Sequence, residues 1–238
     1  NIKEIPQYTF NDCNDLTAIE IPGSVTMIGN SAFFGCKSLK DLRIEDGEGT
    51  LSLGYSTSGN GLLYDCPLEK LFLGRNLSDN TILTYSPFYN KKTLTSVTIS
   101  NSVTSIGLSG FEGCSNVETL YIGSSIESIG SKAFAGCEKI TEIKVALEKP
   151  IRGSDDIFAD AVYNNATLYI PNGTKSLYEK REPWNIFFFI VEMDFTGIDE
   201  IAEQRAEGKN VYYDLSGRVV ENPTSGIYII GGKKVLVK

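Results

Sequence analysis

Five cysteines are the side chains in this sequence best suited to covalent chemistry or metal binding. They are Cys13, Cys36, Cys66, Cys114 and Cys137. Disulfides and zinc sites favour an even number of cysteines, C-x-x-C spacing or histidine partners, whereas here the number is odd and the spacing is wide. Buried thiols that pack as small apolar side chains fit this pattern better. We therefore predict a ladder of free, buried cysteines and no bound metal.

Acid–base chemistry has few candidates because the chain contains no histidine. Histidine is the commonest general base and the usual partner of a nucleophilic serine or cysteine. The carboxylates of Asp155 and Asp156 lie in a segment predicted to be a loop, where solvated charge is the default. The acidic and glycine-rich run at 46–49 could hold a cation, but it lacks the ligand spacing of a calcium loop. The sequence thus predicts a protein that is not an enzyme and uses no cofactor.

The cysteines recur because the sequence around them repeats. The steps from Phe10 to Phe33, from Phe88 to Phe111 and from Phe111 to Phe134 are each 23 residues. Each copy follows the pattern F-x-G-C-x-x-L-x-x-I-x-I. A fixed period of this length is typical of solenoids, in which each coil buries its apolar side against its neighbours. The I-x-I ending alternates like a half-buried strand, so stacked coils should pair these strands into one parallel sheet.

The pattern also predicts the return segment of each coil. In addition, it shows which coils are irregular. Val103 and Ile106 are typical of the short apolar return segments that should cover the sheet. Seven extra residues precede Leu63, which takes the phenylalanine position of its coil, and they suggest an excursion loop with a short strand near 51–53. Lys91 takes the cysteine position of the following coil, so we expect that coil to be locally irregular.

The pattern A-F-x-G-C-x-x-L-x-x-I-x-I resembles the BspA-like (Treponema pallidum type) leucine-rich repeat over about residues 1–192. The resemblance implies a leucine-rich repeat horseshoe of the α/β class, with its parallel sheet on the concave face. It also implies an exported protein, at the cell surface or outside the cell, that adheres to host proteins or to other bacteria. The resemblance is more specific for the fold than for the function, because one fold can carry many different functional sites.

The ends of the solenoid are predicted from departures from the repeat. The chain enters halfway through a coil, from which we expect a native segment upstream. At about 146–192 we predict a closing cap, with Phe158 in the phenylalanine position and Ala161 in the cysteine position. Thr174 is the predicted N-cap of a short helix. The aromatic run at 184–190 should then cover the open end of the last coil.

Residues 196–238 are predicted to form a separate small module. They carry six acidic and six basic side chains, so the whole net charge of −8 falls on residues 1–195. A helical stretch at 198–206 should lead into an antiparallel β-meander, because alternating apolar residues are separated by Gly, Pro and Asn turns. The end of this segment, G-I-Y-I-I-G-G-K-K-V-L-V-K, resembles the C-terminal sorting domains of proteins exported by Bacteroides-like bacteria.

The outward positions of the predicted sheet are the candidate binding site. Each is the residue between the two inward positions of its strand, and the candidates are Arg43, Phe72, Thr98, Tyr121, Lys144 and Tyr169. Solenoids use such a face for recognition, and aromatic residues are enriched at interfaces. A solvated sheet with scattered aromatic residues is the alternative for the same pattern.

Charge and hydropathy narrow the possible partners. An acidic surface repels phosphate backbones, so we expect no nucleic acid partner. The sequence has no apolar run of 18 residues, so we expect no transmembrane segment in this chain. We predict a non-catalytic surface or secreted binding protein whose partner is an extracellular protein or glycan of the host or of neighbouring bacteria. The alternative is a carbohydrate-binding or enzyme-associated surface module.

Overall fold

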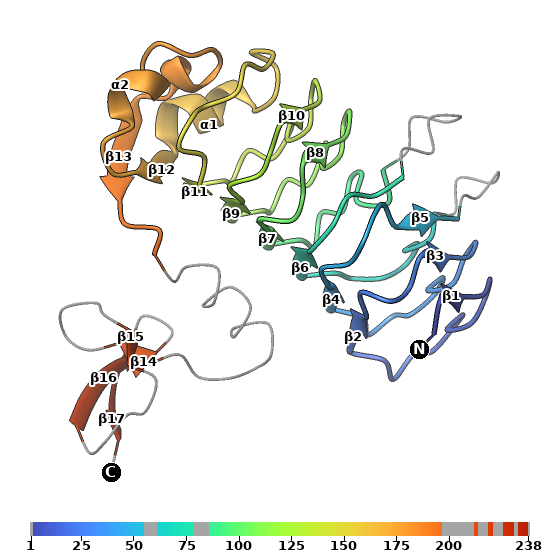
Figure 1. The fold of residues 1–238 in the computed structure, drawn as a ribbon. Helices are drawn as coiled ribbons and strands as arrows, with labels where there is room; N and C mark the ends of the chain where they lie inside the picture. Colours follow the sequence, from blue (N-terminus) through green and yellow to red (C-terminus); the bar gives the residue numbers. More distant parts are fainter. Residues whose placement is uncertain are drawn as a thin grey trace. The chain divides into compact units, whose positions relative to one another are not determined.

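The computed structural model in Figure 1 describes residues 2–54, 61–78 and 86–196, together with four short strands near the C-terminus. The chain divides into two compact units, Asn1–Asp194 and Phe195–Lys238. The first unit is a parallel β-solenoid of about eight turns, as the 23-residue period predicts. Among the described residues, no helix has the length and apolar character needed to cross a membrane.

One strand from each turn contributes to an eight-stranded parallel sheet, which we call the long sheet (Figure 1). Its strands are β2 (Ala18–Ile21), β4 (Asp41–Ile44), β6 (Lys70–Leu73), β7 (Ser96–Ile99), β9 (Thr119–Ile122), β11 (Glu142–Val145), β12 (Thr167–Pro171) and β13 (Phe189–Met193). Equivalent positions are paired from strand to strand, so the inward residues of every turn meet in the core. The predicted inward and outward alternation of the repeats is thereby confirmed.

Short strands on the return side cover the long sheet. They are β1 (Glu4–Ile5), β3 (Met27–Ile28) and β5 (Ser52–Leu53) in one sheet, and β8 (Ser105–Ile106) and β10 (Ser128–Ile129) in another. The predicted strand near 51–53 is confirmed as β5. Within the described residues the repeats contain no helix, so the expected α/β class is wrong for this chain. The return segments are too short for helices and form two-residue strands and turns instead.

The side chain of Asn76 joins the two return sheets. Its Oδ1 accepts hydrogen bonds from the backbone N–H groups of Thr104 (3.0 Å) and Ser105 (3.1 Å), and its Nδ2 donates to Thr104 Oγ1 (2.8 Å). Leu51 and Leu77 form a parallel bridge on the other side of Asn76. One residue thus connects the described parts of the two return sheets.

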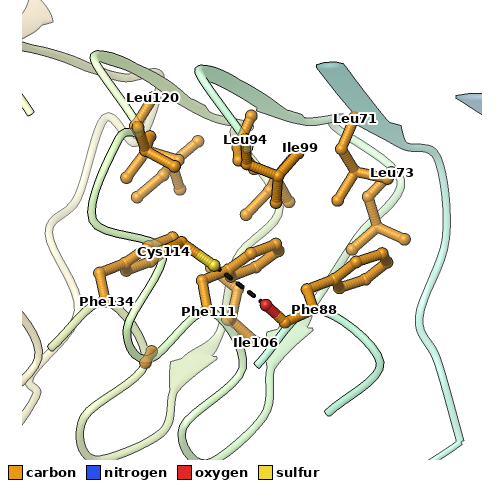
Figure 2. Close-up of a cluster of buried hydrophobic side chains, with 14 of the residues drawn as sticks. Leu71, Leu73, Phe88, Leu94, Ile99, Ile106, Phe111, Cys114, Leu120 and Phe134 are labelled. Atoms are coloured by element: carbon orange, nitrogen blue, oxygen red, sulfur yellow. Dashed lines mark hydrogen bonds between the residues drawn. The ribbon is translucent and has the colours of Figure 1, made fainter. Parts of the chain in front are cut away.

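The phenylalanines of the repeat form a stack through the core (Figure 2). The rings of Phe88 and Phe111 lie 5.3 Å apart, those of Phe111 and Phe134 5.2 Å, and those of Phe134 and Phe158 5.4 Å, with planes within 11° of parallel. Leu63 is buried at the same position in its own turn, as predicted. Because the spacing equals roughly that of adjacent strands, each ring packs on the equivalent ring of the next turn.

The cysteines form a second ladder, in which each thiol donates to a backbone carbonyl of the preceding turn. Cys114 Sγ lies 3.0 Å from the carbonyl oxygen of Phe88 (Figure 2), and Cys36, Cys66 and Cys137 make the same contact at 3.0, 2.9 and 3.2 Å. All four are buried, which confirms the predicted burial for them, whereas Cys13 is partly exposed. The expectation of full burial is therefore wrong for Cys13, because it lies in the first turn and has no described turn on its outer side.

Helix among the described residues is confined to the cap, in α1 (Asp160–Asn165), α2 (Lys175–Tyr178) and the single 3₁₀ turn η1 (Trp184–Ile186). Ala161 is exposed and does not fill the cysteine position, because α1 turns Val162 and Tyr163 inward instead.

Two further expectations for the cap need correction. Thr174 precedes α2 as predicted, but its hydroxyl donates to the Pro171 carbonyl (2.7 Å), so it is not a side-chain cap. In the aromatic run at 184–190, Trp184 and Phe187 are buried against Phe158, which confirms part of the predicted cover. Phe188 and Phe189 are both exposed. Phe188 precedes β13, and Phe189 points outward because β13 continues the alternation of the sheet.

The second unit contains one antiparallel sheet. Its strands are β14 (Tyr212–Tyr213), β15 (Val219–Val220), β16 (Gly226–Ile230) and β17 (Lys233–Val237). The order across the sheet is β15-β14-β16-β17. In a meander each strand would lie beside the next one along the chain, so the meander prediction is wrong although the antiparallel pairing agrees with it. The helical stretch predicted at 198–206 lies outside the described residues.

Candidate functional site

Strand register brings all six predicted site residues into one line across the long sheet. We call the full line, one residue from each strand, the outward row. Its members are Glu20, Arg43, Phe72, Thr98, Tyr121, Lys144, Tyr169 and Val191. Neighbouring strands in a sheet are about 4.8 Å apart, so successive members of the row can touch. The row presents a mixed charged, aromatic and hydroxyl surface rather than a single chemical group.

Arg43 and Phe72 form the tightest contact in the row. The guanidinium carbon of Arg43 lies 3.8 Å from the centre of the Phe72 ring, within the range of a cation–π interaction. Phe72 is consequently only 6% exposed, and Nη1 of Arg43 is buried without a hydrogen-bond partner. The expectation of an exposed aromatic anchor is therefore wrong at Phe72, because its neighbour on β4 covers the ring.

The carboxyl groups of Glu20 and Glu45 lie near Arg43. A hydrogen bond to the Glu20 side chain, together with burial, raises the pKa of the Glu45 carboxyl, while the nearby Arg43 charge acts in the opposite direction. Two carboxyl groups share this corner of the sheet, and one arginine offsets their repulsion. The arrangement compensates charge between neighbouring strands, as expected for a structural or binding surface.

The middle of the row is polar and nearly flat. Ser96, Thr98 and Ser100 bring three small hydroxyl side chains to β7 and the residue after it, and Thr119 Oγ1 donates to Ser96 Oγ (3.0 Å). Tyr121, on the neighbouring strand, is 8% exposed. The prediction of an exposed ring is thus wrong at Tyr121 as well.

Lys144 and Tyr169 form the more accessible end of the row. Lys144 Nζ lies 2.5 Å from Glu142 Oε1 and 6.0 Å from the centre of the Tyr169 ring. All three side chains are partly exposed. The ammonium, the carboxylate and the aromatic ring can all contact a polar or charged side chain of a partner, because each of them is partly exposed to solvent.

Sequence reasoning missed the last strand of the sheet and a buried arginine. Phe189 and Val191 on β13 continue the two outward lines of the sheet, and the alternating apolar residues of this segment could have indicated it. Arg75 is 1% exposed and donates to the carbonyl oxygens of Gly23 and Pro22, both at 3.1 Å. The burial of Arg75 could not be predicted, because the equivalent position after the strand carries different residues in the other repeats, such as Gly23, Asp46 and Asn101.

Across residues 2–54, 61–78 and 86–196, no three His, Cys, Asp or Glu side chains gather closely enough to hold an ion. Two of the described acidic groups near the end of the long sheet are already paired, Glu142 with Lys144 and Glu192 with the backbone N–H of Lys175.

A stacked solenoid with aligned phenylalanine and cysteine ladders and one long parallel sheet defines the class of leucine-rich repeat proteins. The family model described as BspA type leucine rich repeat region, in six copies, matches residues 3–141 and 56–180. The chain belongs to this family. Among curated proteins, no sequence relative is found.

Solved structures of similar proteins come from several bacteria. The T. pallidum leucine rich repeat protein is 19% identical, with 76% of this chain and 77% of that chain covered and a TM-score of 0.36. The pneumococcal vaccine antigen PcpA is 15% identical, with 81% and 71% covered and a TM-score of 0.37. A leucine rich cell surface protein from Faecalibacterium prausnitzii is 20% identical, with 78% and 54% covered and a TM-score of 0.32. The family assignment rests on the repeat model alone.

Proposed function

We propose that this chain is a non-catalytic recognition protein that binds another protein through the outward row of the long sheet. The observation that carries this proposal is the row itself, in which strand register aligns charged, hydroxyl and aromatic side chains over eight strands. Solenoids bind partners through extended surfaces of this kind. The horseshoe curvature, with the long sheet on the concave side, is part of the proposal.

The end of the row at Lys144 and Tyr169 is the proposed centre of binding. Both side chains are partly exposed, and Val191 beyond them is exposed, so this end offers an aromatic ring, two charges and an apolar rim. Interfaces typically combine aromatic anchors with a polar surround. Arg43 and Thr98 would contact a larger partner at its margin, whereas Phe72 and Tyr121 would act mainly by shaping the surface.

We further propose that the protein is exported, displayed at the cell surface or released, and that its partner is an extracellular protein of the host or of neighbouring bacteria. Membership of the BspA type family and the acidic solenoid support this proposal, since negative charge disfavours nucleic acid. Residues 196–238 would serve as a sorting or anchoring module of Bacteroides-like type. No cofactor or metal is part of the mechanism.

A glycan ligand is less well supported than a protein ligand. Sugars bind on exposed aromatic faces, and the rings of Phe72 and Tyr121 are 6% and 8% exposed. Tyr169 alone in the outward row offers a partly open ring. A protein partner can use the whole row, because protein interfaces combine many small polar and apolar contacts.

A binding screen of the purified chain against extracellular matrix proteins, bacterial surface proteins and a glycan array tests the proposal. Tyr169→Ala and Lys144→Glu should each weaken binding to the protein partner about tenfold or more, equivalent to about 1.4 kcal/mol. Leu108→Ala, which changes an exposed side chain on the return side, is the matched control and should leave binding unchanged. Binding to glycans alone, or protein binding that ignores both row variants, would refute the proposal.

A further inference from the structure

The end of the solenoid carries an exposed apolar surface that the cap does not cover. Phe188 is 76% exposed, and its ring meets that of Phe189 edge to face at 4.9 Å. Leu177, Ile186 and Val191 are also exposed nearby in the sequence. Single exposed apolar residues are normal on a protein surface, whereas Phe188 and Phe189 place two large exposed rings in contact, which is typical of an interaction site.

Strand β13 lies at the edge of the long sheet, and among the described residues no backbone group pairs with its outer side. It pairs with β12 on one side, and within the described part of the chain no strand covers its other side. The Met193 carbonyl accepts from the N–H of Asn172 (3.2 Å), so the backbone of Met193 faces β12. Because the direction alternates along a strand, the N–H and C=O groups of Ile190 and Glu192 face the open side.

This edge has only one of the features that normally prevent strand pairing, the inward charge of Glu192. Edge strands are commonly protected by lysine, proline, glycine bulges or inward charges. The sequence of β13, Phe-Ile-Val-Glu-Met, has none of the first three. Its one charge, Glu192, already accepts the backbone N–H of Lys175 (2.8 Å). At the opposite edge of the sheet, β2 carries the exposed Glu20 and is followed by Pro22.

We propose that β13 pairs in antiparallel fashion with β13 of a second copy of the chain, around a two-fold axis at Val191. In this register Val191 faces its own equivalent, and Phe189 faces Met193 of the other copy. The outward side of the pair is then entirely apolar. Glu192 faces Ile190 of the other copy, so the two glutamates lie apart and no like charges oppose each other.

A second copy is the occupant that the strand itself fits best. The five residues of β13 are self-complementary about their central residue, as a two-fold interface requires. Pairing would continue the long sheet from one copy into the other, using the same backbone ladder that joins its eight strands. The exposed Phe188 would pack beside this junction. Dimerisation goes beyond the proposed recognition function and would make its binding surface bivalent.

Site-specific crosslinking of the full chain tests this pairing. The backbone groups of Val191 face β12, so the two Val191 residues would form a non-hydrogen-bonded pair, with Cα atoms about 4.5 Å apart and within disulfide range. Val191→Cys in a Cys13→Ser background, which removes the partly exposed native thiol, should give a covalent dimer under mild oxidation. Leu108→Cys in the same background is the matched control, since Leu108 is 53% exposed on another surface, and it should give only background crosslinking.

Sedimentation analysis supplies the second measurement. Wild-type chain and Leu108→Lys should both sediment as dimers, whereas Val191→Lys should sediment as a monomer with an unchanged melting temperature. A wild-type dissociation constant weaker than about 100 µM would overturn the proposal. A dimer that persists in Val191→Lys, or equal crosslinking of Val191→Cys and Leu108→Cys, would overturn it as well, because the interface would then lie elsewhere.

Discussion

The side-chain ammonium of Lys91 donates a hydrogen bond to the carbonyl oxygen of Leu63. In the neighbouring turns a cysteine thiol makes the equivalent contact, as Cys66 does to Phe33 and Cys114 does to Phe88. Lys91 therefore replaces one thiol in the ladder without breaking its hydrogen-bond pattern. Removing the ammonium of Lys91 from water has an electrostatic cost. The cost is seen in the pKa of Lys91, which burial lowers.

The first prediction concerns the pH dependence of this cost. The pKa of Lys91 is lower in the folded chain than the ordinary value of 10.5, so between these values the unfolded state binds more protons. Stability contributed by this site should therefore rise with pH towards 10.5. Lys91→Met removes the titrating group. The free energy of unfolding of wild type minus that of Lys91→Met should increase as the pH rises towards 10.5.

Urea unfolding at several pH values measures this difference. Lys92→Met is the matched control, because Lys92 is the next residue and is exposed. Its effect on the free energy of unfolding should stay small and constant over the same range. A difference for Lys91→Met that is flat, or that falls as pH rises, would show that the ammonium is not desolvated in the folded chain.

The second prediction concerns the phenylalanine stack. Phe111 has a stacked ring on each side, whereas Phe10 stacks only on Phe33 and is partly buried. Phe111→Ala should lower the free energy of unfolding by about 3–5 kcal/mol, the range for an emptied aromatic core position. Phe10→Ala should cost clearly less. Equal losses in urea unfolding would contradict a core built from turns that contact only their neighbours.

The third prediction concerns thiol reactivity. Cys36, Cys66, Cys114 and Cys137 are buried, so a reagent in solution cannot reach them. Burial also raises the pKa of Cys36 and, to about 12, the pKa of Cys66, which disfavours these two thiolates. A thiol reagent should modify only Cys13 in the native chain and all five cysteines after denaturation. Cys13→Ser should remove the native reaction. Native modification of two or more thiols, or fewer than five in denaturant, would contradict the ladder of free thiols.

The fourth prediction concerns Arg75, which holds two turns together. Its guanidinium donates to the carbonyl oxygens of Pro22 and Gly23, and the side chain is almost fully buried. Arg75→Met should destabilise the chain by about 1–3 kcal/mol for each carbonyl left without a donor. Arg152→Met, at an exposed position, is the control and should change the melting temperature little. Equal melting temperatures for both variants would mean that water replaces the guanidinium.

The repeat positions could be predicted from the sequence because one short pattern recurs at a fixed step. Phe111 has an equivalent phenylalanine one turn away on either side, and Cys114 has an equivalent cysteine in the next turn, and only a stack of coils satisfies such a pattern. The cap could not be predicted with the same accuracy, since it is present once. There the helical period of α1 replaces the repeat and turns Val162 inward in place of Ala161.

The sequence predicted where the residues of the candidate site lie on the sheet, but it did not predict how exposed their side chains are. A period of two residues fixes which face of the sheet a side chain occupies, and it correctly assigned Phe72 and Tyr121 to the outward face. The period does not show which neighbouring side chain covers a residue on that face. Arg43, 29 residues earlier in the chain, lies over the Phe72 ring, and this contact follows from the rotamers of both residues.

The fifth prediction concerns the proposed sorting role of residues 196–238. The chain divides at Asp194, and the second unit has its own antiparallel sheet, so the solenoid should fold without it. The charges of 196–238 cancel, whereas the solenoid carries the whole net charge of −8. Deleting 196–238 should therefore leave the melting temperature of the solenoid nearly unchanged and abolish display at the cell surface.

Calorimetry of the purified chain with and without 196–238, and surface labelling in the native host, measure the two effects separately. Phe10→Ala is the matched control for display, because it keeps the sorting module while lowering stability moderately, and it should still reach the surface. A large fall in melting temperature on deletion would make residues 196–238 a structural cap of the solenoid. Normal display of the deleted chain would place the export and anchoring signals elsewhere, since a sorting module is required for display by definition.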